Sequence, residues 1–149
     1  MEVRDRGWKR ILSEAEKLYS GSVKVGVLSD SGSTAGGDLT LVELAVIHEY
    51  GTDSTPERSF IRSTLDESRG EYKVLSRHLA KQVIGGKITA DQALQAIGAW
   101  GSGKIRTKMA RGPHIPPPLK QATIDRKGSD RPLVDTGTLM NSVTSQVES

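Results

Sequence analysis

The sequence predicts one domain of the α+β class, in which a small, mostly antiparallel sheet packs against several helices and carries an extended, proline-rich arm. Three observations lead to this prediction. Apolar residues recur at three- and four-residue spacing over much of the chain, which is typical of helices with one buried face. Valines alternate with other residues in one early and one late segment, as in half-buried strands. Residues 111–118 contain four prolines, which exclude both a helix and a central strand.

The composition narrows the classes of protein that this chain can belong to. A chain of 149 residues suits a single domain, which buries about 70% of its unfolded surface. Cysteine is absent, which excludes disulfides and thiolate metal sites. Aromatic residues make up only 4%, few for a protein that stacks single-stranded nucleic acid. The sequence has neither a membrane-length apolar run nor a signal-peptide core, so we expect a protein made in a cytoplasm without a membrane partner.

The first third of the chain predicts a helix, a strand, a loop and a second helix. Residues 3–19 have the helical apolar spacing and are followed by a strand over residues 22–28. Glycines, serines and aspartates in residues 29–39 are typical of a flexible surface loop. Thr40 with Glu43 forms a capping box, which predicts a helix over residues 41–50.

The middle of the chain predicts further helices. One is expected from residue 59 to residue 84, with a kink or break at Gly70. A second capping box, Thr89 with Gln92, opens another helix. That helix is expected to reach a hinge at residues 101–103 and to continue for one or two turns beyond it.

The last part of the chain predicts an arm, two short helices and a strand. Residues 111–118 are expected to be extended, and Pro118 suits the first position of a helix that ends before Gly128. A short helix near Leu139 is expected to be capped by Asp135 or Thr136. Residues 142–147 then alternate as a strand, whose partner must lie far away in the sequence.

Charge is unevenly distributed along the chain. Residues 104–131 contain eight basic and two acidic residues, a net charge of +6. Because the whole chain carries +3, the remainder carries −3. This division favours an electrostatic fit with a neighbour, which can be another subunit, another protein or a phosphate backbone. A solvated basic face explains it equally well.

Two stretches resemble proteins that build the particles of tailed bacteriophages. The run from Pro118 to Leu139, with its basic helix, Lys127-Gly128 and Pro132-Leu133-Val134-Asp135-Thr136-Gly137, resembles tail-completion and virion-morphogenesis proteins. The run Ile47-His48-Glu49-Tyr50-Gly51-Thr52, followed by Pro56-Glu57-Arg58-Ser59-Phe60-Ile61-Arg62, resembles a recurring run of neck and head–tail joining proteins.

The resemblance implies a structural protein of the virion, made in the host bacterial cytoplasm, that forms a ring at the neck or at the head-proximal end of the tail. Its implied partners are further copies of itself in a ring, expected to be a hexamer, and the neighbouring connector and tail-tube proteins. DNA would pass through the lumen without sequence readout. Neither run is a reaction signature, so the resemblance implies no enzymatic activity and no cofactor.

Residues on three segments are the candidates for subunit contacts. On a helix, Arg58 and Arg62 would share a face beside Phe60, although they could also serve only as solubilising or ion-pairing residues. Pro116 and Pro117 lie on the arm that we expect to reach a neighbour. The basic candidates are Arg126, Lys127 and Arg131, whose replacement by glutamate is expected to weaken assembly without unfolding the monomer.

Three motifs invite an enzymatic interpretation, and each has a simpler structural explanation. His48-Glu49 opens a zinc-protease motif, but position 52 is a threonine where that motif needs a second histidine. We expect His48, Glu49 and Gly51 to form a helix end, hydrogen-bonded through Thr52 and Arg58.

The other two motifs are equally incomplete. Asp135-Thr136-Gly137 spells the aspartic-protease triplet, but such enzymes are all-β, so we expect these residues to cap a helix. Gly101-Ser102-Gly103-Lys104 lacks the hydroxyl residue that follows the lysine of a phosphate loop. The remaining alternatives are a small basic nucleic-acid-binding domain that uses residues 104–131 and, more weakly, a hydrolase.

Overall fold

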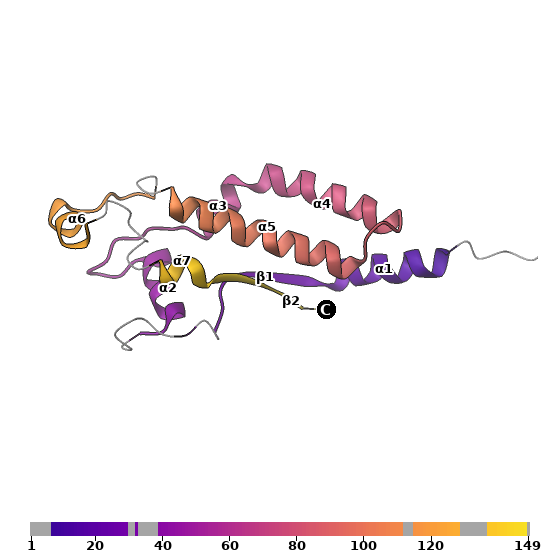
Figure 1. The fold of residues 1–149 in the computed structure, drawn as a ribbon, viewed down its shortest axis with the longest axis horizontal. Coiled ribbons are helices and arrows are strands. Elements are labelled where there is room, and N and C mark those ends of the chain that lie inside the picture. The colour runs from indigo at the N-terminus through magenta and orange to yellow at the C-terminus, as the bar shows by residue number, and fades with distance from the viewer. Residues whose placement is uncertain (1–6, 30–31, 33–38, 112–114, 129–136, 149) are drawn as a thin grey trace, which may run out of the picture.

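The computed structural model describes residues 7–29, 32, 39–111, 115–128 and 137–148. Within these ranges the chain forms seven helices and two strands (Figure 1). In chain order the elements are α1 (Trp8–Ser20), β1 (Ser22–Val27), α2 (Leu41–Tyr50), α3 (Arg62–Glu67), α4 (Arg69–Ile84), α5 (Ala90–Ala110), α6 (Gln121–Lys127), α7 (Thr138–Ser142) and β2 (Val143–Glu148).

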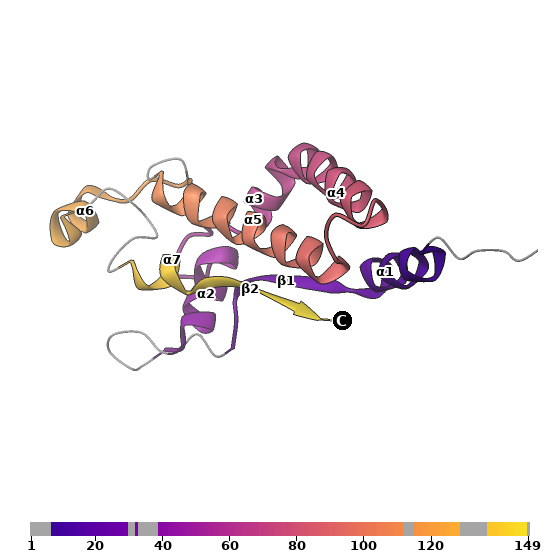
Figure 2. The ribbon, with the colours of Figure 1, turned by 45° about the vertical axis from the view of Figure 1, so that its right-hand side comes forward.

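The sheet joins an early strand to the last one. β1 pairs with β2 in antiparallel register, with Val23 opposite Val147 and Val27 opposite Val143. Helix α5 crosses both strands, and α4 packs on α5 away from the sheet, while α1 contacts α4 and α5 (Figures 1 and 2). The prediction of an α+β fold with a small antiparallel sheet packed against helices is therefore confirmed, as is the pairing of strands that are distant in sequence.

Small residues allow α5 to lie close to the sheet. A Cβ atom on Gly98 would lie 2.6 Å from the Oγ of Ser145 on β2, and one on Gly101 would lie 3.3 Å from the Val25 side chain on β1. The predicted hinge at residues 101–103 is wrong, because α5 runs unbroken through it. Close packing of helix on strand, rather than flexibility, explains glycine at positions 98 and 101.

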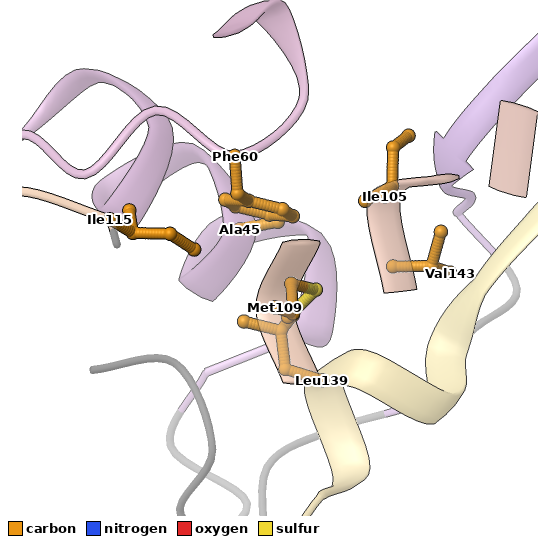
Figure 3. Packing of buried hydrophobic residues seen from close by; sticks show 7 residues of the cluster. All are labelled: Ala45, Phe60, Ile105, Met109, Ile115, Leu139 and Val143. Carbon is orange, nitrogen blue, oxygen red and sulfur yellow. The ribbon is translucent and has the colours of Figure 1, made fainter. Parts of the chain in front are cut away.

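The main core lies where α2, α5, α7 and β2 meet. Met109 of α5 lies near its centre, with Phe60 and Ile115 on one side and Leu139 on the other (Figure 3). The remaining buried members of this cluster are Ala45, Ile105 and Val143. A second buried cluster, formed by Leu79, Val83 and Ala93, joins α4 to α5.

Helix starts follow the predicted capping boxes. Thr40 accepts a hydrogen bond from the backbone N–H of Glu43, whose carboxylate accepts one from the N–H of Thr40 at 2.8 Å. Thr89 and Gln92 make the same reciprocal pair at the start of α5. Each box satisfies two backbone donors that the helix itself leaves unpaired, which explains why both predictions are confirmed.

Several other boundaries differ from the predictions. The single helix expected over residues 59–84 is two helices that meet at Ser68, while Gly70 lies inside α4. Helix α6 begins at Gln121 rather than at Pro118, although Gly128 does end it, with φ of 66°. Helix α7 is capped by Gly137, with φ of 75°, and the predicted caps Asp135 and Thr136 lie outside the described residues.

Two predicted irregular segments are described only in part. Most of the loop predicted over residues 29–39 lies outside the described residues, as do residues 112–114 of the arm. None of the helices in the described ranges is long and apolar enough to cross a lipid bilayer.

Candidate functional site

Glu49, in the last turn of α2, binds the start of α3. Its carboxylate is buried and accepts hydrogen bonds from the backbone N–H groups of Phe60, Ile61 and Arg62 at 2.8–2.9 Å. The Ser59 hydroxyl donates a further bond at 2.8 Å. Backbone donors at a helix start are a favourable environment for an anion, so one side chain from α2 completes the beginning of α3.

The environment of Glu49 keeps its carboxylate ionised. Burial by itself raises the pKa of this group, because it disfavours the charged form. Hydrogen bonds from the backbone of Ile61, Arg62 and Phe60 and from Ser59 outweigh that effect, so the pKa of Glu49 lies below its ordinary value of 4.5. A buried negative charge therefore persists at neutral pH.

Arg62 connects this buried carboxylate to the surface. Its Nε donates to Glu49 Oε1 at 3.0 Å, and its Nη2 donates to Glu57 Oε1 at 2.6 Å. Its guanidinium also lies over the Tyr50 ring, 4.7 Å from the ring centre. We call Glu49, Tyr50, Glu57 and Arg62 the Arg62 cluster. Because about half of the Arg62 side chain is exposed, this cluster has a buried end and a solvent-facing end.

A tight turn folds residues 48–62 back on themselves. Gly51 has φ of 74°, and a Cβ atom there would lie 2.8 Å from the backbone nitrogen of Glu57. The His48 carbonyl accepts a hydrogen bond from the backbone N–H of Arg58 at 2.7 Å, as the predicted helix end requires. Thr52, in contrast, bonds to Thr55 within the turn. Glycine at position 51 is therefore required both by its backbone conformation and by the close approach of residue 57.

Arg58 fastens the proline-rich arm to this turn. This residue is 7% exposed, and its Nε donates to the Pro117 carbonyl at 2.9 Å. Burial lowers the pKa of Arg58. Ile115, also on the arm, is buried in the core cluster with Phe60. The described part of the arm is thus held against the body, while the side chains of Pro116 and Pro117 face solvent.

The structure divides the predicted contact residues into two groups. Phe60 is fully buried and Arg58 nearly so, and both support the fold of the monomer. The exposed candidates are Arg62, Pro116 and Pro117, which belong to the turn and the arm that Arg58 joins. Arg131 and the side chains of Arg126 and Lys127 lie outside the described residues.

Some basic residues of segment 104–131 bind partners within the chain. Lys104 pairs with Glu71 at 2.5 Å, and Lys108 pairs with Glu67 at 2.7 Å, so α5 is tied to α3 and α4. The Arg106 side chain donates to the Val143 carbonyl at the start of β2, at 3.0 Å from Nε. At least three of the eight basic residues of this segment therefore serve internal contacts.

The described residues do not assemble the motifs that suggested catalysis. They contain no group of three or more His, Asp or Glu side chains placed to hold a metal ion. Residues 101–104 lie within α5, so they form helix rather than a phosphate-binding loop. Of the aspartic-protease triplet only Gly137 is described, as the cap of α7.

Two features that organise this site are not apparent from the sequence. Glu49 was expected at a helix end bonded through Thr52 and Arg58, whereas its carboxylate binds residues 59–62. The pairing of Arg58 with Pro117 joins residues 59 positions apart, and no local pattern indicates it. When the chain is compared with protein-family models, with curated proteins and with solved structures, nothing matches.

Proposed function

We propose that this chain is a structural virion protein of a tailed phage or prophage, which forms a ring at the head–tail neck or at the head-proximal end of the tail. In this role it closes the tail or joins it to the head, and it is not an enzyme. The resemblance of residues 47–62 and 118–139 to phage neck and tail-completion proteins carries the proposal.

The geometry of the first of these runs supports the proposal. His48, Glu49 and Gly51 form the turn. Arg58 binds the arm, Phe60 packs in the core, and Arg62 pairs with Glu49 at the surface. A recurring run whose residues interlock in this way is typical of a building block, because it holds one surface in a fixed shape. The exposed Arg62, Pro116 and Pro117 lie on that surface.

At this position in the particle, the protein has three kinds of neighbour. Copies of this chain contact one another in a ring, expected to be a hexamer, with the connector on one side and tail-tube proteins on the other. DNA passes through the lumen without being read. A ring needs heterologous contacts, in which one face of a subunit binds a different face of the next.

Purified particles provide the direct test. Mass spectrometry of density-purified virions should detect the chain in a fixed ratio to the connector protein. Cells that lack its gene should accumulate separate heads and tails, and a plasmid copy should restore joined particles. Complete, infectious particles that contain none of this chain would overturn the proposal.

Replacement of Arg126, Lys127 and Arg131 by glutamate tests whether the basic end of α6 contributes to the ring. We expect fewer joined particles and an unchanged circular dichroism spectrum, because reversed charges disfavour a neighbour of opposite sign. Glutamate at Lys9, Arg10 and Lys17 of α1 provides a control with the same change in net charge. Equal assembly by both triple variants would contradict this part of the proposal.

The alternative, a nucleic-acid-binding domain, has weaker support because Lys104, Arg106 and Lys108 have partners within the chain. It predicts an affinity for DNA that falls steeply with salt, since neutralised phosphates release counterions. A DNA titration that stays flat at low salt would exclude it.

A further inference from the structure

The two-stranded sheet has two edges to which the described chain adds no strand. β1 pairs only with β2, and β2 only with β1. In an antiparallel pair, backbone N–H and C=O groups at alternate positions point away from the partner strand. Such edges can accept a strand from another chain.

A groove lies between β1 and helices α4 and α5. It has a volume of about 790 Å³ and is lined by residues of β1, α4 and α5, together with Leu18, Gly21 and Leu65. None of the residues that line it belongs to β2.

The walls of this groove are mainly apolar. Val23 and Val25 of β1 line the groove together with Ala80 and Tyr72 of α4. Trp100 of α5 lies beside Tyr72, with 6.1 Å between their ring centres. About two fifths of Tyr72 is exposed. The groove thus combines unpaired strand groups with apolar side chains, as a site for an added strand requires.

The edges themselves indicate which strand fits. Within the described residues, each copy has one free edge from β1 and one from β2. Pairing β1 with β1 of a second copy would leave both β2 edges open, whereas pairing β1 with a neighbour's β2 uses both kinds of edge. Only this second arrangement is heterologous and can close into a ring.

Strand direction agrees with this arrangement. If the ring axis is roughly parallel to the strands, rotation about it leaves the direction of β1 unchanged from one subunit to the next. The neighbour's β2 then runs antiparallel to β1, as β2 does within the monomer, and the sheet continues without a change of pattern.

The side chains of β2 also suit the groove. Val143, Ser145 and Val147 share the face that packs on α5, and a Cβ atom on Gly98 would touch Ser145. A neighbour's β2 would direct the same small and apolar side chains toward Tyr72 and Ala80. Glu148 and Lys24, which pair at 2.5 Å within the monomer, lie on the other face of the sheet and leave the groove free of this ion pair.

We infer that the groove between β1 and α4 binds strand β2 of a second copy of this chain, so that the sheets of neighbouring subunits become continuous. This inference rests on the proposed ring and names the contact that forms it.

The absence of cysteine makes a direct test simple. Lys24→Cys on β1 and Gln146→Cys on β2 are made as separate single variants, so no disulfide can form within one chain. Both side chains are exposed and lie on the face of the sheet away from α5. Opposite residues of paired strands have Cα atoms about 4.5–5.5 Å apart, within the range of a disulfide. Neighbouring positions, Ser22→Cys and Glu148→Cys, allow for a different register.

The two cysteine variants are oxidised separately and mixed, both as purified protein at high concentration and in particles assembled from co-expressed copies. The inference expects disulfide-linked dimers in the mixture only. Dimers in the Lys24→Cys sample alone would show β1 paired with β1 and would overturn it. Absence of the mixed dimer from both preparations, at every register tested, would do the same.

Ser76→Arg places a large charged side chain in the groove, and Ser13→Arg places it on the exposed face of α1, outside the groove. Loss of the mixed dimer is expected with the first change and not with the second. Equal dimer formation by the two variants would contradict the inference. Detection of the chain in particles is scored separately, so failure of this contact and failure of the proposed function remain distinguishable.

Discussion

The Nε atom of Arg62 lies 3.0 Å from Oε1 of Glu49, in a pair whose two members differ sharply in exposure. The carboxylate side chain is 5% exposed and the arginine side chain 48%. The charge that binds the start of α3 is therefore shielded from water, while its counter-charge is open to solvent. Loss of either residue affects both the fold and the surface of residues 48–62.

Glu49→Gln should lower the free energy of unfolding by about 3 to 5 kcal/mol, because it leaves buried donors without an acceptor. Oε1 accepts from Ser59 and Arg62 and Oε2 from Phe60 and Ile61, so an amide nitrogen in either place would meet donors. Urea unfolding measures the change. Glu57→Gln, which alters the solvent-exposed partner of Arg62, should cost less than about 1 kcal/mol. Equal losses in the two variants would show that burial of Glu49 is unimportant.

Stability should fall as the pH drops below about 4.5, in part because of Glu49. Its pKa is lower in the folded chain than the ordinary 4.5 expected after unfolding, so the unfolded chain takes up a proton first. The stabilisation by Glu49 is complete above 4.5 and is lost as the pH falls through the folded-state pKa. Urea unfolding between pH 3 and pH 6 should show a smaller pH dependence for Glu49→Gln than for the parent chain. Identical slopes would argue against an ionised Glu49 in the folded chain.

Gly98→Ala should destabilise the protein by about 1 to 3 kcal/mol, since the new Cβ would lie 2.6 Å from the Ser145 Oγ atom and force α5 away from the sheet. Gly103→Ala, in the same helix, has no atom within 4 Å of the new Cβ. It should stabilise α5 by about 0.5 to 1 kcal/mol, because alanine favours helix. Thermal unfolding of both variants gives the comparison, and opposite signs are expected. If Gly103→Ala instead destabilises the protein, that result would support the hinge predicted from the sequence at residues 101–103.

Arg58→Met should release the arm without unfolding the body. It removes the hydrogen bond to the Pro117 carbonyl and keeps most of the apolar stem. A hydrogen bond to a charged group contributes about 1.5 to 3 kcal/mol. Its loss should increase the fraction of molecules whose arm has left the body, and therefore the rate of tryptic cleavage at Arg111 or Lys120, by roughly tenfold or more. Arg69→Met, which changes an exposed arginine paired with Asp66, is the control. Equal cleavage rates would mean that Arg58 does not hold the arm.

Local patterns predicted the fold well where local physics decides it. The pairs Thr40 with Glu43 and Thr89 with Gln92 are short-range hydrogen-bond signals, and both mark true helix starts. Alternating valines identified β1, and the late alternation identified β2. The break between α3 and α4 was misplaced at Gly70, because the backbone changes direction at Ser68 and Gly70 continues as helix.

Long-range contacts account for the remaining errors. Glycines at positions 101 and 103 suggested a hinge, but whether glycine loosens a helix or lets it approach a neighbour depends on what lies opposite. Here Val25 lies against Gly101. The partners of Glu49 and Arg58 were missed for the same reason. Residues 10 to 59 positions away become neighbours only after the chain has folded.

The sheet connects Ser22 with Glu148, near opposite ends of the sequence. During translation β1 must therefore wait until residues 143–148 have been made, and non-local pairing of this kind forms late in folding. Until then α5 can pack only on β1, and Ser145 is missing from the surface that Gly98 approaches. The packing of α5 on both strands is therefore completed only after residues 143–148 have left the ribosome.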